Sequence, residues 1–277
     1  MMRSLFSAVA GLRTHQTRMD VIGDNIANVN TVGFKKSAVT FKDVFYQTLR
    51  GGSAATEDTG VGGTNPQQIG LGVTLGSIDV IHTQGAAQAT GNGTDLMIQG
   101  DGFFVVTDGQ NVYLTRAGAF HFDNEGNLVT ADGLKVVSSG NADETGISVD
   151  DTVKIDPEAQ SYSIDRTGKL VYVDKDGNVS QDEIRIWLVK VVNPAGLEKY
   201  GSNLYLYKPA AGTPTGGYAG EDTFANTTII PSALEMSNVE LAQEFTDMII
   251  TQRGFQANAR TITVSDEMLQ ELVNLKR

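Results

Sequence analysis

Mostly apolar positions at both ends of the chain recur with the spacing of an amphipathic α-helix, and this pattern limits the possible fold more than any other feature. Near the N-terminus the steps between these positions alternate between three and four residues. Such steps place side chains along one stripe of a helix, as in the seam of a coiled coil. The sequence therefore predicts a helix that ends between Asn28 and Gly33, where turn-forming residues begin. The seam positions are Leu5, Ala8, Leu12, His15, Met19, Ile22, Ile26 and Val29.

A second stripe of the same type lies near the C-terminus. Ser237 and Glu240 have the spacing of a capping box, which predicts a helix start just before the stripe. Polar Gln252 and Asp266 fall in register on the stripe, where they either set the register of helix packing or face solvent. The last two residues are basic, and cations there oppose the helix dipole. The seam positions are Leu241, Phe245, Met248, Phe255, Ala259, Ile262, Leu269 and Val273.

The chain between the two helices has a different character. Residues 33–72 are predicted to form an extended linker, because glycine, threonine, serine and alanine are abundant in residues 51–76. From residue 73 to 207, short β-branched and aromatic runs alternate with glycine-containing turns, and residues 208–230 are again loop-like. The predicted strands are Phe103–Thr107, Val112–Thr115, Phe120–Phe122, Leu128–Thr130, Leu170–Val173 and Ile184–Val192.

These patterns predict an α+β fold in several parts. An N-terminal helix (1–32) and a C-terminal helix (231–277) pair as a coiled coil, and an all-β outer domain (73–230) is inserted between them on extended glycine-rich linkers (33–72). A lone pair of helices on such linkers is marginally stable, because one apolar stripe hardly offsets the entropy of ordering each helix. We therefore expect neighbouring copies to supply further burial, and the two ends to fold on assembly.

Composition excludes several classes of function. The 277 residues carry a formal net charge of -12, which disfavours binding to nucleic acid and to anionic membrane surfaces. The chain has no cysteine, so disulfides, thiolate metal sites and cysteine nucleophiles are excluded. No apolar run reaches the ~18 residues of a membrane-spanning helix. We interpret the N-terminal run as mature helix rather than a cleaved signal, because its helical periodicity continues past any cleavage point.

No group of residues predicts catalysis, a metal site or a cofactor. The acidic run 174–183 has Val179 where a calcium loop needs glycine, so a hairpin turn is favoured. Gly60–Gly63 and Gly70–Gly72 do not complete a phosphate-binding motif and are interpreted as linker. The histidines are interpreted as packing or surface residues, and they are His15, His82 and His121.

Several longer motifs resemble those of bacterial flagellar rod and hook proteins. The run 23–36 (GDNIANVNTVGFKK) is similar to the N-terminal signature of this family, and the run 95–104 (DLMIQGDGFF) is similar to the start of its β domain. The matching shorter runs are 115–120 (TRAGAF), 193–197 (NPAGL), 234–239 (LEMSNV), 252–258 (QRGFQAN) and 266–269 (DEML). Within these motifs we single out Asn25, Asn28, Gly33, Phe34, Gly100, Gly102, Phe103, Gln252 and Arg253.

The resemblance implies a structural subunit that is not an enzyme and needs no cofactor. Subunits of this kind leave the cell unfolded through the flagellar type III export channel without a cleaved signal. Their terminal helices form an inner tube, and their β domains form the outer shell. The implied partners are further copies of the chain, rod and hook–filament junction proteins, the hook cap and the export apparatus. Neither nucleic acid nor membrane insertion is implied, and the implied location is the extracellular flagellum.

Within the family, the wording of the C-terminal motifs resembles hook proteins. We therefore expect a hook subunit, part of a flexible tube that passes motor torque to the filament. Two alternatives stay open. The long segment Tyr46–Val73 is associated with the stiff distal rod, so a distal rod protein is the second expectation. A secreted carbohydrate-binding or hydrolytic β domain is the third, although it leaves the terminal helix stripes without a role.

Overall fold

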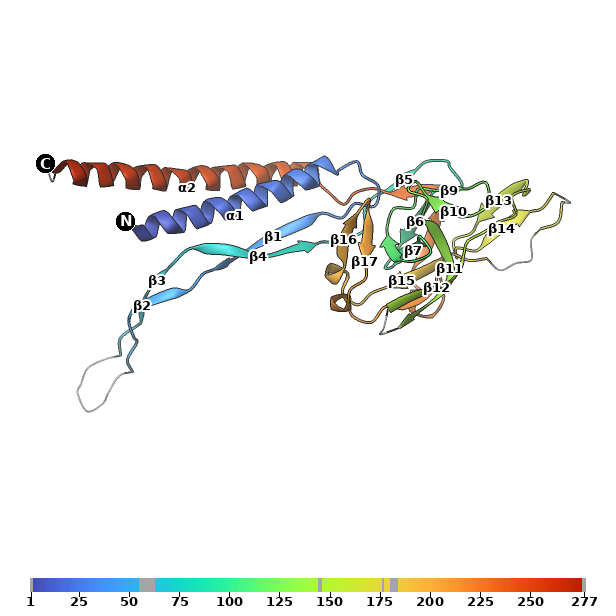
Figure 1. Cartoon of the computed structure of the whole chain (residues 1–277), viewed down its shortest axis with the longest axis horizontal. Coiled ribbons are helices and arrows are strands. Elements are labelled where there is room, and N and C mark those ends of the chain that lie inside the picture. Colours follow the sequence, from blue (N-terminus) through green and yellow to red (C-terminus); the bar gives the residue numbers. More distant parts are fainter. Residues whose placement is uncertain (1, 55–62, 144–145, 176, 180–183, 276–277) are drawn as a thin grey trace. The chain divides into compact units, whose positions relative to one another are not determined.

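The chain folds as two compact units, which we describe separately in a computed structural model (Figure 1). The structure describes residues 2–54, 63–143, 146–175, 177–179 and 184–275. The helical unit contains residues 1–26, 37–79 and 240–277, and the β unit contains residues 27–36 and 80–239. Gly60–Gly62, part of the acidic run 174–183 and the basic residues 276–277 fall outside the described residues, wholly or in part.

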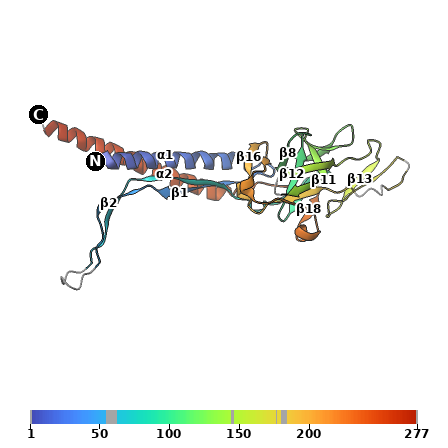
Figure 2. The same ribbon diagram turned by 60° about the horizontal axis from the view of Figure 1, so that its bottom comes forward.

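The described part of the helical unit contains two helices and four strands. Helix α1 ends at Ala27, within one residue of the end that the turn formers predict. Strand β1 pairs with β4 and strand β2 pairs with β3, which gives two separate two-stranded sheets (Figures 1 and 2). The elements are α1 (Met2–Ala27), β1 (Ser37–Asp43), β2 (Tyr46–Arg50), β3 (Gln67–Gly70), β4 (Val73–Val80) and α2 (Leu241–Leu275).

The segment 33–72 differs from the expected linker, because most of its described part is paired. Strand β2 pairs antiparallel with β3, with Tyr46 opposite Gly70. Strand β1 pairs with a strand that starts at Val73, and no short turn connects the two, so the pairing leaves no local signal in the sequence. The division between units also differs, since residues 27–36 belong to the β unit. The reason is that Gly33 donates a backbone hydrogen bond to the Glu235 carbonyl at 2.7 Å.

The β unit centres on a ten-stranded sheet with the path β16-β17-β8-β7-β11-β10-β9. Strand β12 pairs with β11, and β15 pairs with both β7 and β18. Smaller pairs are β13–β14, β6–β19 and β5–β20. The strands are β5 (Ala87–Ala89), β6 (Leu96–Gln99), β7 (Phe103–Thr107), β8 (Val112–Thr115), β9 (Phe120–Phe122), β10 (Leu128–Thr130), β11 (Lys135–Asp143), β12 (Gly146–Thr152), β13 (Ser161–Ile164), β14 (Leu170–Val173), β15 (Trp187–Lys190), β16 (Glu198–Gly201), β17 (Leu204–Leu206), β18 (Thr215–Tyr218), β19 (Thr228–Pro231) and β20 (Ala233–Glu235).

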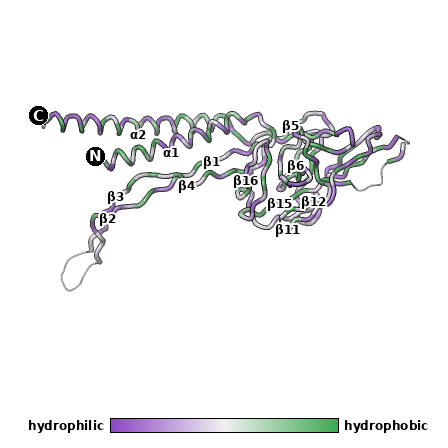
Figure 3. Tube along the Cα trace, viewed as in Figure 1, coloured by the Kyte–Doolittle hydropathy of each residue, from purple (hydrophilic) through white to green (hydrophobic). Residues whose placement is uncertain are grey.

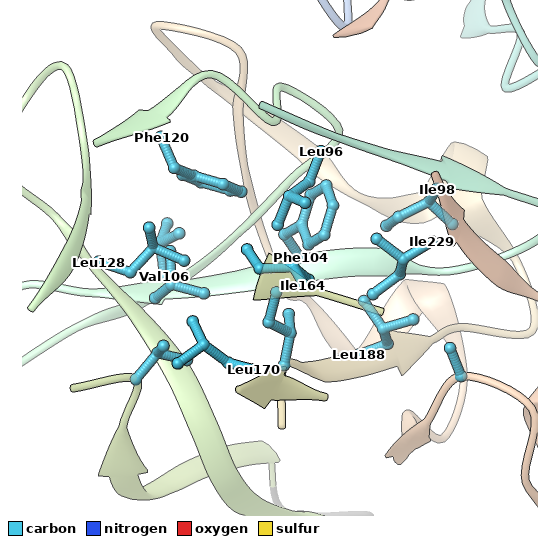
Figure 4. Close-up of a cluster of buried hydrophobic side chains, with 14 of the residues drawn as sticks. Leu96, Ile98, Phe104, Val106, Phe120, Leu128, Ile164, Leu170, Leu188 and Ile229 are labelled. Carbon is cyan, nitrogen blue, oxygen red and sulfur yellow. The ribbon is translucent and has the colours of Figure 1, made fainter. Parts of the chain in front are cut away.

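Strand β7 is buried on both of its faces. Phe104 and Val106 point into one hydrophobic cluster, together with Leu128 and Leu188 (Figure 4). The neighbouring positions, starting with Phe103, point into a second cluster around Trp187. Alternation along a strand puts successive side chains on opposite faces, so a strand with a core on each side needs an unbroken apolar run. The run Phe-Phe-Val-Val meets this requirement.

The strands predicted at β7, β8, β9, β10 and β14 have the predicted bounds, and β15 is shorter than its prediction. The prediction of loop for 208–230 is wrong in two places, because β18 pairs with β15, and β19, which begins at Thr228, pairs with β6. Glycine content hid β18. A Cβ at Gly216 would lie 2.1 Å from Cζ2 of Trp187, and one at Gly217 would lie 2.9 Å from Cδ2 of Phe224. The two glycines therefore make room for large aromatic side chains.

Candidate assembly surface and buried charge cluster

Small and polar residues make the contact between α1 and α2. A Cβ added to Gly11 would lie 2.7 Å from Nδ2 of Asn258. Nearer the other end of α1, the Asn25 amide donates a hydrogen bond to Glu244 at 3.2 Å. Arg18 forms an ion pair with Asp247 at 3.1 Å. The two helices therefore run antiparallel, and close approach is possible because glycine presents no side chain.

This contact line repeats every seven residues. Helix α1 contributes positions 11, 18 and 25 to it, and α2 contributes positions 244, 251, 258 and 265. Thr251 and Ser265 are buried there and bond to carbonyls of their own helix. An apolar search misses this repeat, because its members are small or polar. A search for small and polar residues at seven-residue spacing finds it.

Strand β1 also packs on α1. Asn25 exchanges two hydrogen bonds with the backbone of Ser37, at 2.9 and 3.0 Å. The His15 ring meets Phe41 edge-on, with ring centroids 5.7 Å apart. Burial and the nearby Arg18 charge lower the pKa of His15. Asn25, one of the motif residues, therefore joins three parts of the helical unit, since it also holds Glu244.

The predicted seams do not meet as one buried core within the chain, and their pairing as a coiled coil stays a prediction. Ala8 and Ile22 are buried. Three positions are exposed, namely Leu241, Phe245 and Val273. The half-buried positions are Leu5, Leu12, His15, Met19, Ile26, Val29, Met248, Phe255, Ala259, Ile262 and Leu269. Polar Gln252 and Asp266 are exposed in the single chain.

Large apolar side chains instead lie on the outside of both helices, where hydrophobic positions recur along the length of α2 (Figure 3). Ile249 is 58% exposed and Phe6 is 68% exposed. Exposed apolar side chains that share one side of a helix, as the four-residue steps between positions 241, 245 and 249 allow, indicate a binding surface. We call this set the exposed helix surface, and it consists of Met2, Phe6, Val9, Leu241, Phe245, Ile249, Ile250, Val264, Met268, Leu272, Val273 and Leu275.

Two glycine substitutions test the helix contact. A Cβ at Gly254 would lie 2.7 Å from the His15 ring, whereas Gly23 has nothing within 4 Å. We expect Gly23→Ala to stabilise the helical unit by up to ~1 kcal/mol, since alanine favours helix. We expect Gly254→Ala to lose that gain and to destabilise by roughly 1–3 kcal/mol through overpacking. Thermal melts of the unassembled chain, followed by circular dichroism, measure both. Equal effects of the two substitutions contradict the contact.

A cluster of buried charges lies in the β unit. Lys35 is fully buried, and its Nζ donates to Oε1 of Glu235 at 2.6 Å. Arg116, which is 6% exposed, donates from Nη1 to Oε2 of the same carboxylate at 3.3 Å. The Gly85 amide also donates to Glu235, at 2.9 Å. Burial lowers the pKa of Lys35, and the Glu235 charge opposes that shift. One carboxylate thus holds two buried cations.

The cluster joins motifs that are far apart in sequence. Gly33 has a φ of 70°, and a Cβ there would lie 2.6 Å from the Ala117 amide, so only glycine fits. Arg116 donates from Nη2 to the Gly100 carbonyl at 2.8 Å and lies over the Phe103 ring, 5.3 Å from its centroid. The result is one polar junction inside the β unit.

The remaining motif residues have separate surroundings. The Phe34 ring lies under Lys199, with Nζ 4.7 Å from the centroid. Gly102 has a φ of 131°, which favours glycine. Asn28 accepts a hydrogen bond from Thr31 at 3.1 Å, where the chain turns after α1. Gln252 and Arg253 are exposed on α2.

The histidines do not gather with other ligand-type residues. His121 is exposed on β9, and the structure shows no group of three His, Asp or Glu side chains suited to a metal ion within residues 2–54, 63–143, 146–175, 177–179 and 184–275. Over the same ranges, no helix combines the length and the apolar character needed to cross a bilayer. Ser237, which the capping box predicts at the start of α2, lies before Leu241, the first residue of that helix. Its hydroxyl accepts a hydrogen bond from the Val239 amide.

We expect His82 to make the stability of the β unit sensitive to acid. Its ring meets Phe103 and Tyr205 at centroid distances of 5.6 and 5.4 Å. Burial, followed by the charges of Lys35, Arg116 and Lys199, lowers the pKa of His82 from 6.5 to about 4, and the nearby Pro194 carbonyl opposes the shift. The unfolded chain therefore binds a proton at a higher pH than the folded chain does, so stability falls as pH drops from 6.5 towards 4.

We expect His82 to account for at most about 3 kcal/mol of this loss. The measurement is the difference in unfolding free energy between the unaltered chain and His82→Gln across that pH range. Taking the difference removes the contribution of the carboxylates, which titrate in both proteins. The substituted chain should lose less stability on acidification, and parallel pH profiles contradict the assignment.

Comparison with known proteins agrees with this arrangement of motifs. Residues 5–35 match the family described as "Flagella basal body rod protein". Residues 97–181 match "Flagellar hook protein FlgE/F/G D1 domain", and residues 230–275 match "Flagellar basal body rod FlgEFG protein C-terminal". The matched segments therefore cover α1, most of the ten-stranded sheet and α2.

Relatives align over the full length of the chain. The flagellar basal-body rod protein FlgG of Bacillus subtilis is 50% identical over 278 residues, with all of both chains covered. In Borreliella burgdorferi, FlgG is 36% identical over 283 residues and the flagellar hook protein FlgE is 30% identical over 446, again with both chains covered. Rod and hook proteins are structural subunits without enzymatic activity, and this chain belongs to their family, the flagellar rod and hook proteins.

Proposed function

We propose that the chain is a subunit of the distal rod of the bacterial flagellum, which polymerises through the exposed helix surface. The observation that supports the rod most directly is the 50% identity to a flagellar basal-body rod protein across both full chains. The two relatives from one organism rank in the same order, with the rod protein at 36% and the hook protein at 30%. The expected hook role therefore gives way to the rod alternative.

A structural feature favours the same choice. The segment Tyr46–Val73, associated with the stiff rod, contributes strands β2 and β3. Phe45 is 85% exposed beside this hairpin, and Leu49 and Ile69 are exposed on it. Apolar side chains on a projecting hairpin can pack between neighbouring copies and resist sliding. A tube whose subunits are locked in this way is stiff, as a drive shaft must be.

In this proposal the chain is exported and then assembled within the flagellum. The chain leaves the cell through the type III export channel and adds to the growing rod, and its contacts are further copies of itself, other rod proteins and the hook. The acidic net charge of -12 argues against nucleic acid as a partner.

Electron microscopy of the purified, polymerised chain tests the rod assignment. We expect straight tubes of uniform stiffness. Replacing Phe45, Leu49 and Ile69 with serine removes exposed apolar contacts without touching the helices, and these tubes should bend. Curved tubes from the unaltered chain support the hook instead. The matched control is Tyr162→Ser, which removes a 40% exposed aromatic residue from β13 in the other unit.

A further inference from the structure

A cavity of about 240 Å³ opens in the β unit beside the buried charge cluster. Its polar lining comes from His82, Asp101, Arg116 and Lys190, and Phe103 and Val191 supply apolar wall. Only part of its lining falls within the family motifs, and none of its lining residues belongs to the exposed helix surface.

Two of the lining side chains have hydrogen-bonding atoms without a partner among the described residues. Arg116 uses Nη1 and Nη2 on Glu235 and Gly100, but its buried Nε has no partner. Both ring nitrogens of the half-buried His82, one of them a donor in the neutral ring, are likewise enclosed, and the nearby Pro194 carbonyl makes no hydrogen bond of ordinary geometry with either. Buried donors of this kind are rarely left unsatisfied, because a buried donor without an acceptor loses its hydrogen bond to water and gains none in return. The cavity therefore presents donors to an acceptor that the described chain does not supply.

The charges around the cavity are also unbalanced. Lys35 and Arg116 share the single carboxylate of Glu235. Lys190 is paired with Asp101 at 2.9 Å, and Asp101, which is largely exposed to solvent, also acts on the charge of Arg116. Three cations thus face two carboxylates in these pairs, which leaves one positive charge beside the cavity. Buried charge is normally compensated by a counter-ion.

We propose that this cavity binds a carboxylate group, held by Arg116 Nε and the His82 ring. The volume and the mixed lining suit a short acid, whose methylene carbon packs on Phe103 and Val191 while its oxygens accept the hydrogen bonds. Phosphate, which is polar on every side, fits an apolar wall less well. Asp101 repels any anion at the rim, so the binding strength comes from the deeper Arg116 and His82.

Two sources supply such a group, namely a free small acid and an aspartate or glutamate side chain of a neighbouring copy. The second source rests on the proposed polymer. It is favoured by the composition, since the chain carries 33 acidic against 21 basic residues. A side chain from a neighbour would place this cavity at a contact between β units in the polymer.

The test uses the full, unassembled chain at pH 7, with histidine and arginine side chains labelled for NMR, and acetate as the probe. We expect acetate to cause saturable shifts of the Arg116 Nε and His82 signals and to raise the pKa of His82, because the bound anion stabilises the imidazolium. The exposed His121 serves as an internal control and should not respond. His82→Phe should weaken the Arg116 response about tenfold.

Absence of a saturable response overturns the proposal, and so does an equal response to chloride at the same ionic strength. A second arm identifies the source in the assembled polymer. A neighbour's carboxylate in the cavity raises the pKa of His82 without added acetate and prevents acetate from binding. An unchanged pKa with acetate still bound assigns the site to a free acid. Failure to polymerise counts against the proposed rod function, but it leaves the acetate arm decisive.

Discussion

Replacing Ile249 and Ile250 with glutamate prevents polymerisation at concentrations where the unaltered chain assembles. The two side chains are 58% and 57% exposed in the single chain, so a folded monomer loses little by the change. In the polymer they lose contact with water, and burying an apolar side chain is worth roughly 1.5–3 kcal/mol. With about half of each side chain already covered, we expect the critical concentration to rise on the order of tenfold to several hundredfold.

The matched control keeps the apolar character. Ile249→Leu with Ile250→Leu should assemble at a critical concentration close to that of the unaltered chain, because its buried area is similar. Circular dichroism shows whether the glutamate variant keeps its helix content. If the glutamate variant is helical and assembles at the same critical concentration as the unaltered chain, this part of α2 lies outside the subunit contacts.

Replacing Glu235 with glutamine destabilises the β unit more than any surface ion-pair substitution. The carboxylate is fully buried and holds Lys35 and Arg116, so its loss leaves two buried cations without their partner. Removing one partner of a buried ion pair costs about 3–5 kcal/mol. For a unit of this size the melting temperature should fall by roughly 6–20 °C.

The control for Glu235 is the exposed pair of Lys208 and Glu198, 3.3 Å apart and close to half exposed or more on both sides. We expect Glu198→Gln to change stability by less than about 1 kcal/mol, as is typical of surface ion pairs. Thermal unfolding of the full chain, with the single tryptophan Trp187 in the β-unit core as the probe, measures both substitutions. Similar melting temperatures for the two variants contradict the cluster's structural role.

The sequence predicts the positions of the helices and strands better than it predicts the contacts between them. Helical spacing placed α1 and α2, and turn glycines bounded β7 to β10, since these signals are local. The apolar pattern does not predict the face on which the helices meet, because the contact uses Gly11, Asn25 and Glu244. Apolar spacing identified part of a surface that stays exposed in the chain, such as Phe245.

Long-range pairing explains the other differences. Lys35 and Glu235 lie 200 residues apart, and both occur in recognised motifs, yet nothing in the sequence pairs them. In the sequence, Lys35 and Lys36 look like a pair of surface lysines, and only the fold shows that Lys35 is buried. The β1–β4 ribbon was likewise hidden, because its strands are joined through a second hairpin rather than a short turn.

Sedimentation of the purified full chain over a range of concentrations, with nothing else present, tests the central claim that the helices are completed by neighbouring copies. We predict single chains below a critical concentration and long tubes above it, with hydrogen exchange in α1 and α2 much slower in the tubes than in the single chains. Single chains at every concentration, with both helices already protected, would contradict it.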